Sequence, residues 1–80
     1  MIKYVSSIDF IEFYFDNKNA GCIRTGHFKR TDYLTKGQIF VDVLFSLNYY
    51  KYSKFIKSKY NSVKEAKLDI EKVYKLMVFQ

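Results

Sequence analysis

Apolar and polar residues alternate along much of the first half of the chain, which is the pattern of strands that bury one face. The clearest strand is predicted for residues 38–48, and a second strand of the same kind for residues 8–16. In the first of these, one parity is apolar throughout and is expected to face the core: Ile39, Val41, Val43, Phe45 and Leu47.

Two further strands complete the predicted sheet. Residues 16–21 are rich in Asp, Asn and Gly, which tolerate left-handed backbone conformations, so a turn there should lead into a strand over residues 22–28. A polar connector over residues 29–37 follows. Residues 49–59 are predicted to form a strand with Tyr50, Tyr52 and Ile56 on one side and lysines on the other. Residues 2–5 can add a short fifth strand.

The C-terminal segment predicts a capped helix over residues 62–78. Ser62 and Glu65 form a capping-box pattern, in which the serine hydroxyl accepts a hydrogen bond from a first-turn amide. Apolar residues then recur at helical spacing and form one stripe: Val63, Ala66, Ile70, Val73 and Met77. The chain is therefore predicted to be a single α+β domain over residues 1–80, an antiparallel sheet of four to five strands packed on one C-terminal helix.

Length and composition set the class of protein. Eighty residues, 49% of them hydrophobic, suffice for one packed domain and not for two. The single cysteine, Cys22, excludes an intramolecular disulfide and favours a reducing compartment. The N-terminus lacks the pattern of a signal peptide, and the longest apolar run is too short to cross a bilayer. We therefore expect a soluble, cytoplasmic protein that does not enter a membrane.

Catalytic chemistry needs several donor groups at one place, and the sequence offers few. The chain has one histidine, His27, and it lies five residues from Cys22. In one strand that spacing directs the two side chains to opposite faces, which argues against a nucleophile pair or a shared metal site. Asp9 and Glu12 are also an odd number of residues apart, so their carboxylates should point to opposite faces of a strand. We predict a non-enzyme without catalytic residues, bound metal or cofactor, with Cys22 as a small buried filler and His27 at the surface.

Charge is the strongest indication of function. Residues 1–48 carry a net charge of +1, whereas residues 49–80 hold eight lysines and three acids, a net charge of +5. Such a basic surface with exposed apolar side chains suits phosphate contacts with base stacking, or an acidic protein partner, and a merely solvated lysine surface is the alternative. The predicted partner surface consists of Lys51, Phe55, Lys57 and Lys59 on the last strand and Lys64, Leu68, Lys72 and Lys75 on the helix.

The source is indicated by residue usage and by a resemblance. Phe, Tyr, Met, Ile, Asn and Lys make up 41 of the 80 residues, which is typical of an AT-rich genome such as that of a low-GC bacterium or a phage. The segment Lys59–Ala66 (KYNSVKEA) resembles the strand–turn–capped-helix ending of small phage and mobile-element proteins. Two such groups are the arm-type DNA-binding domains of tyrosine integrases and the small α+β anti-CRISPR and related anti-defence proteins.

The resemblance implies two functions. The first is a phage-type inhibitor that docks on a host nucleic-acid-processing complex, such as a CRISPR nuclease, in the host cytoplasm. The alternative is a DNA- or RNA-binding regulator that uses the basic, aromatic-bearing surface. A housekeeping interaction module is a third reading, and the sequence leaves a homodimer open.

Overall fold

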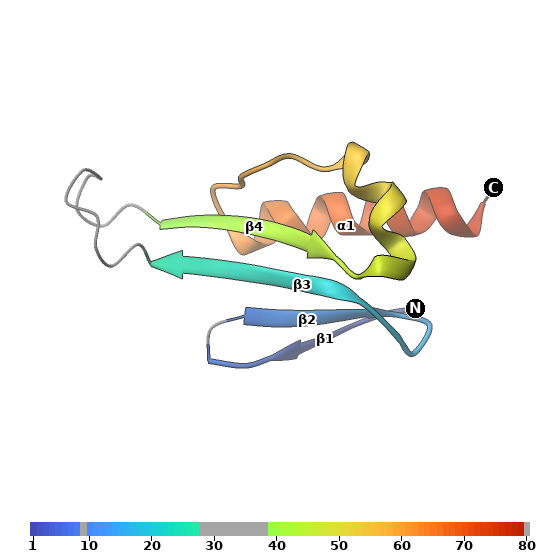
Figure 1. The fold of residues 1–80 in the computed structure, drawn as a ribbon, viewed down its shortest axis with the longest axis horizontal. Helices are drawn as coiled ribbons and strands as arrows, with labels where there is room; N and C mark the ends of the chain where they lie inside the picture. The colour runs from blue at the N-terminus through green and yellow to red at the C-terminus, as the bar shows by residue number, and fades with distance from the viewer. Residues whose placement is uncertain (9, 28–38, 80) are drawn as a thin grey trace.

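The computed structural model describes residues 1–8, 10–27 and 39–79. Four strands are followed by a 3-10 helix and one α-helix (Figure 1). This arrangement confirms the predicted α+β class and the antiparallel sheet packed against a C-terminal helix. The elements are β1 (Ile2–Ser6), β2 (Phe10–Phe15), β3 (Lys18–His27), β4 (Ile39–Phe45), η1 (Leu47–Phe55) and α1 (Val63–Val78).

The sheet is an antiparallel meander with the strand order β1-β2-β3-β4. The β2–β3 turn is tight, because only Asp16 (φ 50°) and Asn17 (φ 71°) separate the two strands and both adopt positive φ. Two such residues are typical of the type I′ turns that match the twist of a hairpin. The register between β2 and β3 then shifts at Phe13 and Tyr14. Gly21, at φ 153°, lies beside this irregularity.

One face of the sheet, here called the inner face, forms the core. Phe13 contacts Phe45 edge-to-face, with ring centroids 5.6 Å apart at an angle of 86°. Such contacts add stabilisation beyond the area that the rings bury. Both η1 and α1 pack on this face, since their buried residues belong to the same cluster. The buried core residues are Phe13, Phe15, Ala20, Ile23, Val41, Val43, Phe45, Tyr52, Tyr60, Ala66, Ile70 and Val73.

The predicted helix is confirmed together with its cap. Ser62 precedes α1, and its side chain accepts a hydrogen bond from the Glu65 amide at 3.2 Å. Ala66, Ile70 and Val73 of the predicted stripe are buried against the sheet. At the other end of the helix the Tyr74 hydroxyl donates to Asp16 at 2.7 Å, which joins α1 to the β2–β3 turn.

The predicted fourth strand over residues 49–59 is wrong. Residues 47–55 form the 3-10 helix η1. An irregular segment over residues 56–62, here called the connector, joins η1 to α1. The aromatic residues Tyr49, Tyr52 and Phe55 recur every three residues, which is the period of a 3-10 helix. Tyr49 and Tyr52 pack toward the sheet, whereas Phe55 contacts Tyr52 and is 49% exposed. The prediction that Leu47 faces the core is also wrong, because Leu47 lies beyond the end of β4 and is 93% exposed.

Other boundaries differ in detail. The strand predicted over residues 22–28 begins at Lys18, because the turn before it needs only two residues. The strand predicted over residues 8–16 spans Phe10–Phe15, and Ile8 is exposed outside it. The strand predicted over residues 38–48 spans Ile39–Phe45. The short N-terminal strand is present as β1. The predicted connector over residues 29–37 lies outside the described residues.

Candidate interaction surface

The chain between β4 and α1 carries a one-sided charge. From residue 43 to residue 64 the sequence holds five lysines and no acidic residue. All five lysine side chains are exposed: Lys51, Lys54, Lys57, Lys59 and Lys64. A dense positive charge on one segment attracts anionic partners and speeds their encounter with the protein.

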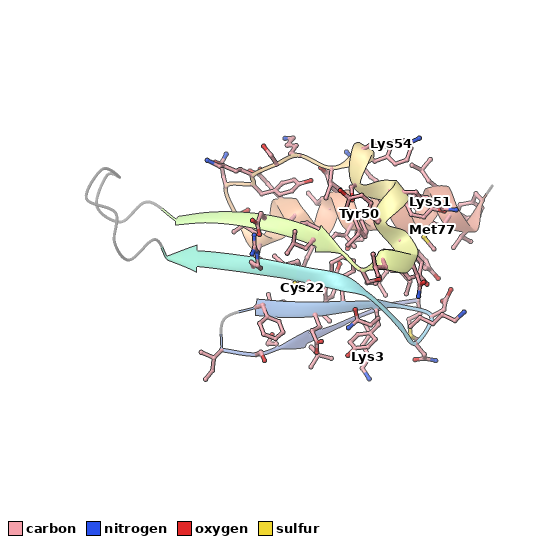
Figure 2. All side chains as sticks on the ribbon, viewed as in Figure 1. Lys3, Cys22, Tyr50, Lys51, Lys54 and Met77 are labelled. Carbon is pink, nitrogen blue, oxygen red and sulfur yellow. The ribbon has the colours of Figure 1, made fainter. Side chains whose placement is uncertain are left out.

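The 3-10 helix presents this charge outward. Tyr52 is buried, and Tyr49 packs edge-to-face on Phe15 with ring centroids 5.4 Å apart. Because side chains three residues apart lie on one side of a 3-10 helix, Lys51 and Lys54 share another side of η1. Figure 2 shows Tyr50, Lys51 and Lys54 on η1, at the same end of the molecule as Met77 of α1. The two helices are in contact.

Three of the lysines in η1 and the connector lie over aromatic rings. The Nζ atoms of Lys51 and Lys54 are each 5.3 Å from a ring centroid, those of Tyr52 and Phe55 respectively. Lys57 lies over Tyr60 in the same way, at 5.8 Å. Each such contact is worth about 0.5–1 kcal/mol at an exposed site and restricts where the ammonium group lies. The charge is therefore held close to the aromatic surface of η1 and the connector.

Tyr60 fastens the connector to the rest of the fold. Its backbone forms two hydrogen bonds with Val41, at 3.1 and 2.7 Å, on the outer edge of β4. Its hydroxyl accepts from the Lys57 amide at 2.9 Å and donates to Asp69 of α1 at 2.7 Å. Burial raises the pKa of Tyr60 to about 12, and the bond to Asp69 acts in the same direction. One residue thus joins β4 through its backbone, and the connector and α1 through its side chain.

Tyr60→Phe is expected to destabilise the fold by about 1–3 kcal/mol, because the Lys57 amide and Asp69 each lose a partner. Urea denaturation followed by circular dichroism measures the loss. Tyr50→Phe is the matched control, since its ring is 66% exposed. The raised folded pKa adds a second signature: stability from this group is present below pH 10 and is lost as the pH rises toward about 12. The phenylalanine variant should lack that part of the alkaline loss, and a variant as stable as the wild type would exclude the anchoring role.

The outward face of α1 carries the other half of the predicted surface. Successive residues of an α-helix are rotated by about 100° around its axis. The four predicted residues therefore lie within one arc of the helix surface, opposite the buried Ala66, Ile70 and Val73. Lys72 lies 3.8 Å from Asp69, so part of the charge there is neutralised. Leu68 is 50% exposed among the lysines. The members of this face are Lys64, Leu68, Lys72 and Lys75.

The prediction of a strand face is wrong for four residues of the candidate surface: Lys51, Phe55, Lys57 and Lys59. Lys51 and Phe55 belong to η1, whereas Lys57 and Lys59 lie in the connector. All four are exposed. The two-residue period also misplaced Tyr50, which it assigned to the side of Tyr52, and it left Lys54 out of the predicted surface. The three-residue recurrence of the aromatic residues was the signal that could have identified both.

The structure places the candidate catalytic and metal-binding residues, Cys22 and His27, on one strand, β3. Cys22 is half-buried on the face of the sheet away from the helices rather than a core filler, and burial raises the pKa of its thiol. His27 is in β3, but its side chain and Asp9 lie outside what the structure describes. Within residues 1–8, 10–27 and 39–79, no three His, Cys, Asp or Glu side chains gather as metal ligands would. The absence of enzymatic activity stays a prediction.

In the described part of the chain, no helix is long and apolar enough to cross a membrane. Comparison with protein families, with curated proteins and with solved structures gave no match. The resemblance noted for residues 59–66 therefore stays a prediction.

Proposed function

We propose that this chain is a non-enzymatic binding protein that docks on an acidic surface of a larger protein or nucleoprotein complex. The contact is made by the lysine–aromatic surface, defined as Tyr50, Lys51, Lys54, Phe55, Lys57 and Lys59. The observation that carries the proposal is a segment with concentrated lysines, no acidic residue and two exposed rings. Aromatic side chains are enriched at the centres of protein interfaces, and polar residues form the rim around them.

The arrangement of the rings favours a protein partner over bare nucleic acid. A base-stacking platform needs an open ring face, but the Lys54 ammonium lies over the Phe55 ring. The surface also contains no arginine, the side chain that most often reads bases. Arg24 is engaged elsewhere, with Asp42 on the sheet, through bonds of 2.9 and 2.7 Å.

The charge also restricts how the protein would inhibit a nucleic-acid-processing complex. A protein of net charge +6 does not imitate DNA, because imitation of phosphates needs an acidic surface. It would engage an acidic protein patch or the exposed phosphates of bound nucleic acid. A residue usage typical of AT-rich genomes supports a phage or mobile-element source for such an inhibitor.

A DNA- or RNA-binding regulator is the second candidate. Tyr50, which is 66% exposed, favours it, since a free ring beside lysines can stack on a base. The two candidates differ in salt dependence. Binding through phosphates weakens steeply with salt, by nearly one unit of log affinity per log salt for each contact.

The test combines two measurements on one set of variants. Fluorescence anisotropy measures binding to a labelled single strand and a labelled duplex over a salt series. Affinity capture from nuclease-treated bacterial lysate, followed by mass spectrometry, measures retention of a protein complex. The variants are Lys51→Glu with Lys57→Glu, and Phe55→Ala. The control, Lys3→Glu with Lys18→Glu, changes net charge equally but lies on the sheet.

We expect nucleic acid to bind weakly, with a Kd of about 10⁻⁴–10⁻⁶ M at physiological salt. A protein complex should be retained by the wild type and the control and lost in both surface variants. Tight nucleic-acid binding whose salt slope falls in the lysine variant would establish the second candidate instead. Unchanged retention and unchanged nucleic-acid binding in folded variants would overturn both.

A further inference from the structure

The sheet has a second face, here called the outer face, over which no element of the described chain packs. Both η1 and α1 lie on the inner face. The register aligns one outer-face residue from each strand in a row, Val5, Glu12, Cys22 and Leu44. Val5 and Leu44 in this row are 40% and 46% exposed. Figure 2 places Cys22 along the middle of the sheet and Lys3 at its β1 edge.

The outer face is electrically balanced, unlike the rest of the molecule. Its described charges are two basic residues, Lys3 and Arg24, and two acidic residues, Glu12 and Asp42. Most of these groups already have partners on the same face. Arg24 forms a two-pronged pair with Asp42, and Glu12 accepts from Tyr14 at 3.4 Å and from Asn19 at 3.3 Å. A partner that covers this face would therefore leave few buried polar groups without a hydrogen-bond partner.

A shallow hollow lies in the same face. The hollow has a volume of about 230 Å³, and its lining includes Glu12, Asn19 and Gly21. An apolar cavity of about 150 Å³ accepts a benzene ring, so this hollow has room for an apolar side chain of a partner. Its rim carries the exposed Leu44 and Phe10, and Cys22 and Phe45 also line it.

We propose that two copies of the chain associate through their outer sheet faces. The charge distribution favours a second copy of the chain as the partner that covers this face. The chain carries +6, of which residues 49–80 contribute +5, so two copies meet with the least repulsion through a face whose charges cancel. A strongly charged partner would gain nothing from a face whose charges cancel. A two-fold interface also needs a surface that complements itself, and this face offers an exposed Leu44 beside a hollow.

The area of the face predicts a weak dimer. Four strands about 4.8 Å apart and six residues at about 3.4 Å each cover roughly 400 Å² per copy. The two faces together then bury on the order of 800–1,000 Å², which is below the size of a standard stable interface. The dimer leaves both lysine–aromatic surfaces exposed on its two opposite sides, so this inference does not rest on the proposed function.

The experiment is sedimentation velocity of the full chain over a concentration series up to about 0.5 mM, where weak dimers of this size populate. The wild type is expected to dimerise with a micromolar Kd, and Leu44→Lys to weaken the dimer at least about tenfold. Leu68→Lys is the matched control, because Leu68 is a leucine of similar exposure on the outward face of α1. It should dimerise like the wild type. Val5→Lys provides a second test if Leu44→Lys fails to fold.

A cysteine cross-link identifies the face. Packed sheets lie about 10 Å apart, which is beyond the reach of a disulfide, so a short bis-maleimide is used. Because Cys22 lies on a central strand, a two-fold axis through the face brings both copies of Cys22 within reach of the reagent. Cross-linking should fall on dilution and in Leu44→Lys. A wild type that stays monomeric, or a dimer that is lost in Leu68→Lys and kept in Leu44→Lys, would overturn the proposal.

Discussion

Ile70→Asp is expected to abolish cooperative unfolding. Ile70 is fully buried in the middle of α1, and an aspartate there would place an unpaired carboxylate in the core. The cost exceeds about 5 kcal/mol, which is close to the whole stability of a domain of this size. Val43→Asp should have the same effect from the sheet side, because Val43 is 6% exposed on the facing strand β4.

Thermal and urea unfolding followed by circular dichroism measure this effect. Leu68→Asp is the control, because it introduces the same charge two residues away on the outward side of α1. We expect it to change stability by no more than about 0.5 kcal/mol. A cooperative transition of normal midpoint in Ile70→Asp or Val43→Asp would show that the assignment of the core is wrong.

Gly21→Ala is expected to cost about 3 kcal/mol or more. A Cβ atom at this position would lie 2.1 Å from the Leu44 carbonyl oxygen and 2.9 Å from the Phe45 Cα. Both contacts are with the backbone of the neighbouring strand, which cannot move aside without breaking the β3–β4 pairing. The φ of 153° adds strain for any residue with a side chain.

Asn17→Gly provides a control of opposite sign. Asn17 adopts φ 71° in the β2–β3 turn, and glycine accepts that conformation without strain. Asp-Gly is also a preferred pair for this turn, so the variant should be unchanged or up to about 1 kcal/mol more stable. Urea denaturation compares the two variants. Equal stability of Gly21→Ala and the wild type would contradict the close approach of β3 and β4.

The two proposed surfaces have different functions and different physical bases. The lysine–aromatic surface acts through concentrated charge and is expected to lose partners as salt rises. The outer face acts through apolar contact and self-complementarity and should be less sensitive to salt. A dimer would display two copies of the lysine–aromatic surface, and linked binding of both to one large partner would raise the apparent affinity.

Local pattern was sufficient for most of the architecture. The alternation in residues 39–45 determines which side of β4 is buried, because one face of the strand is apolar and one is mixed. The apolar stripe of α1 and its Ser62 cap are likewise encoded within the helix and its first neighbour. These features depend on contacts a few residues apart, so they can be inferred without knowing the neighbouring elements.

Local pattern is ambiguous in residues 47–55, because Tyr50 and Tyr52 fit a period of two whereas Tyr49, Tyr52 and Phe55 fit a period of three. The tertiary structure decides between them. At the end of β4, Phe45 pairs with Gly21 and the Ser46 amide donates to Ala20, beyond which β3 soon turns back toward β2. The chain instead coils so that Tyr52 reaches the core, and Tyr60 pairs with Val41 at the free edge. The placement of Lys54 over Phe55, and so the form of the candidate surface, depends on these long-range contacts.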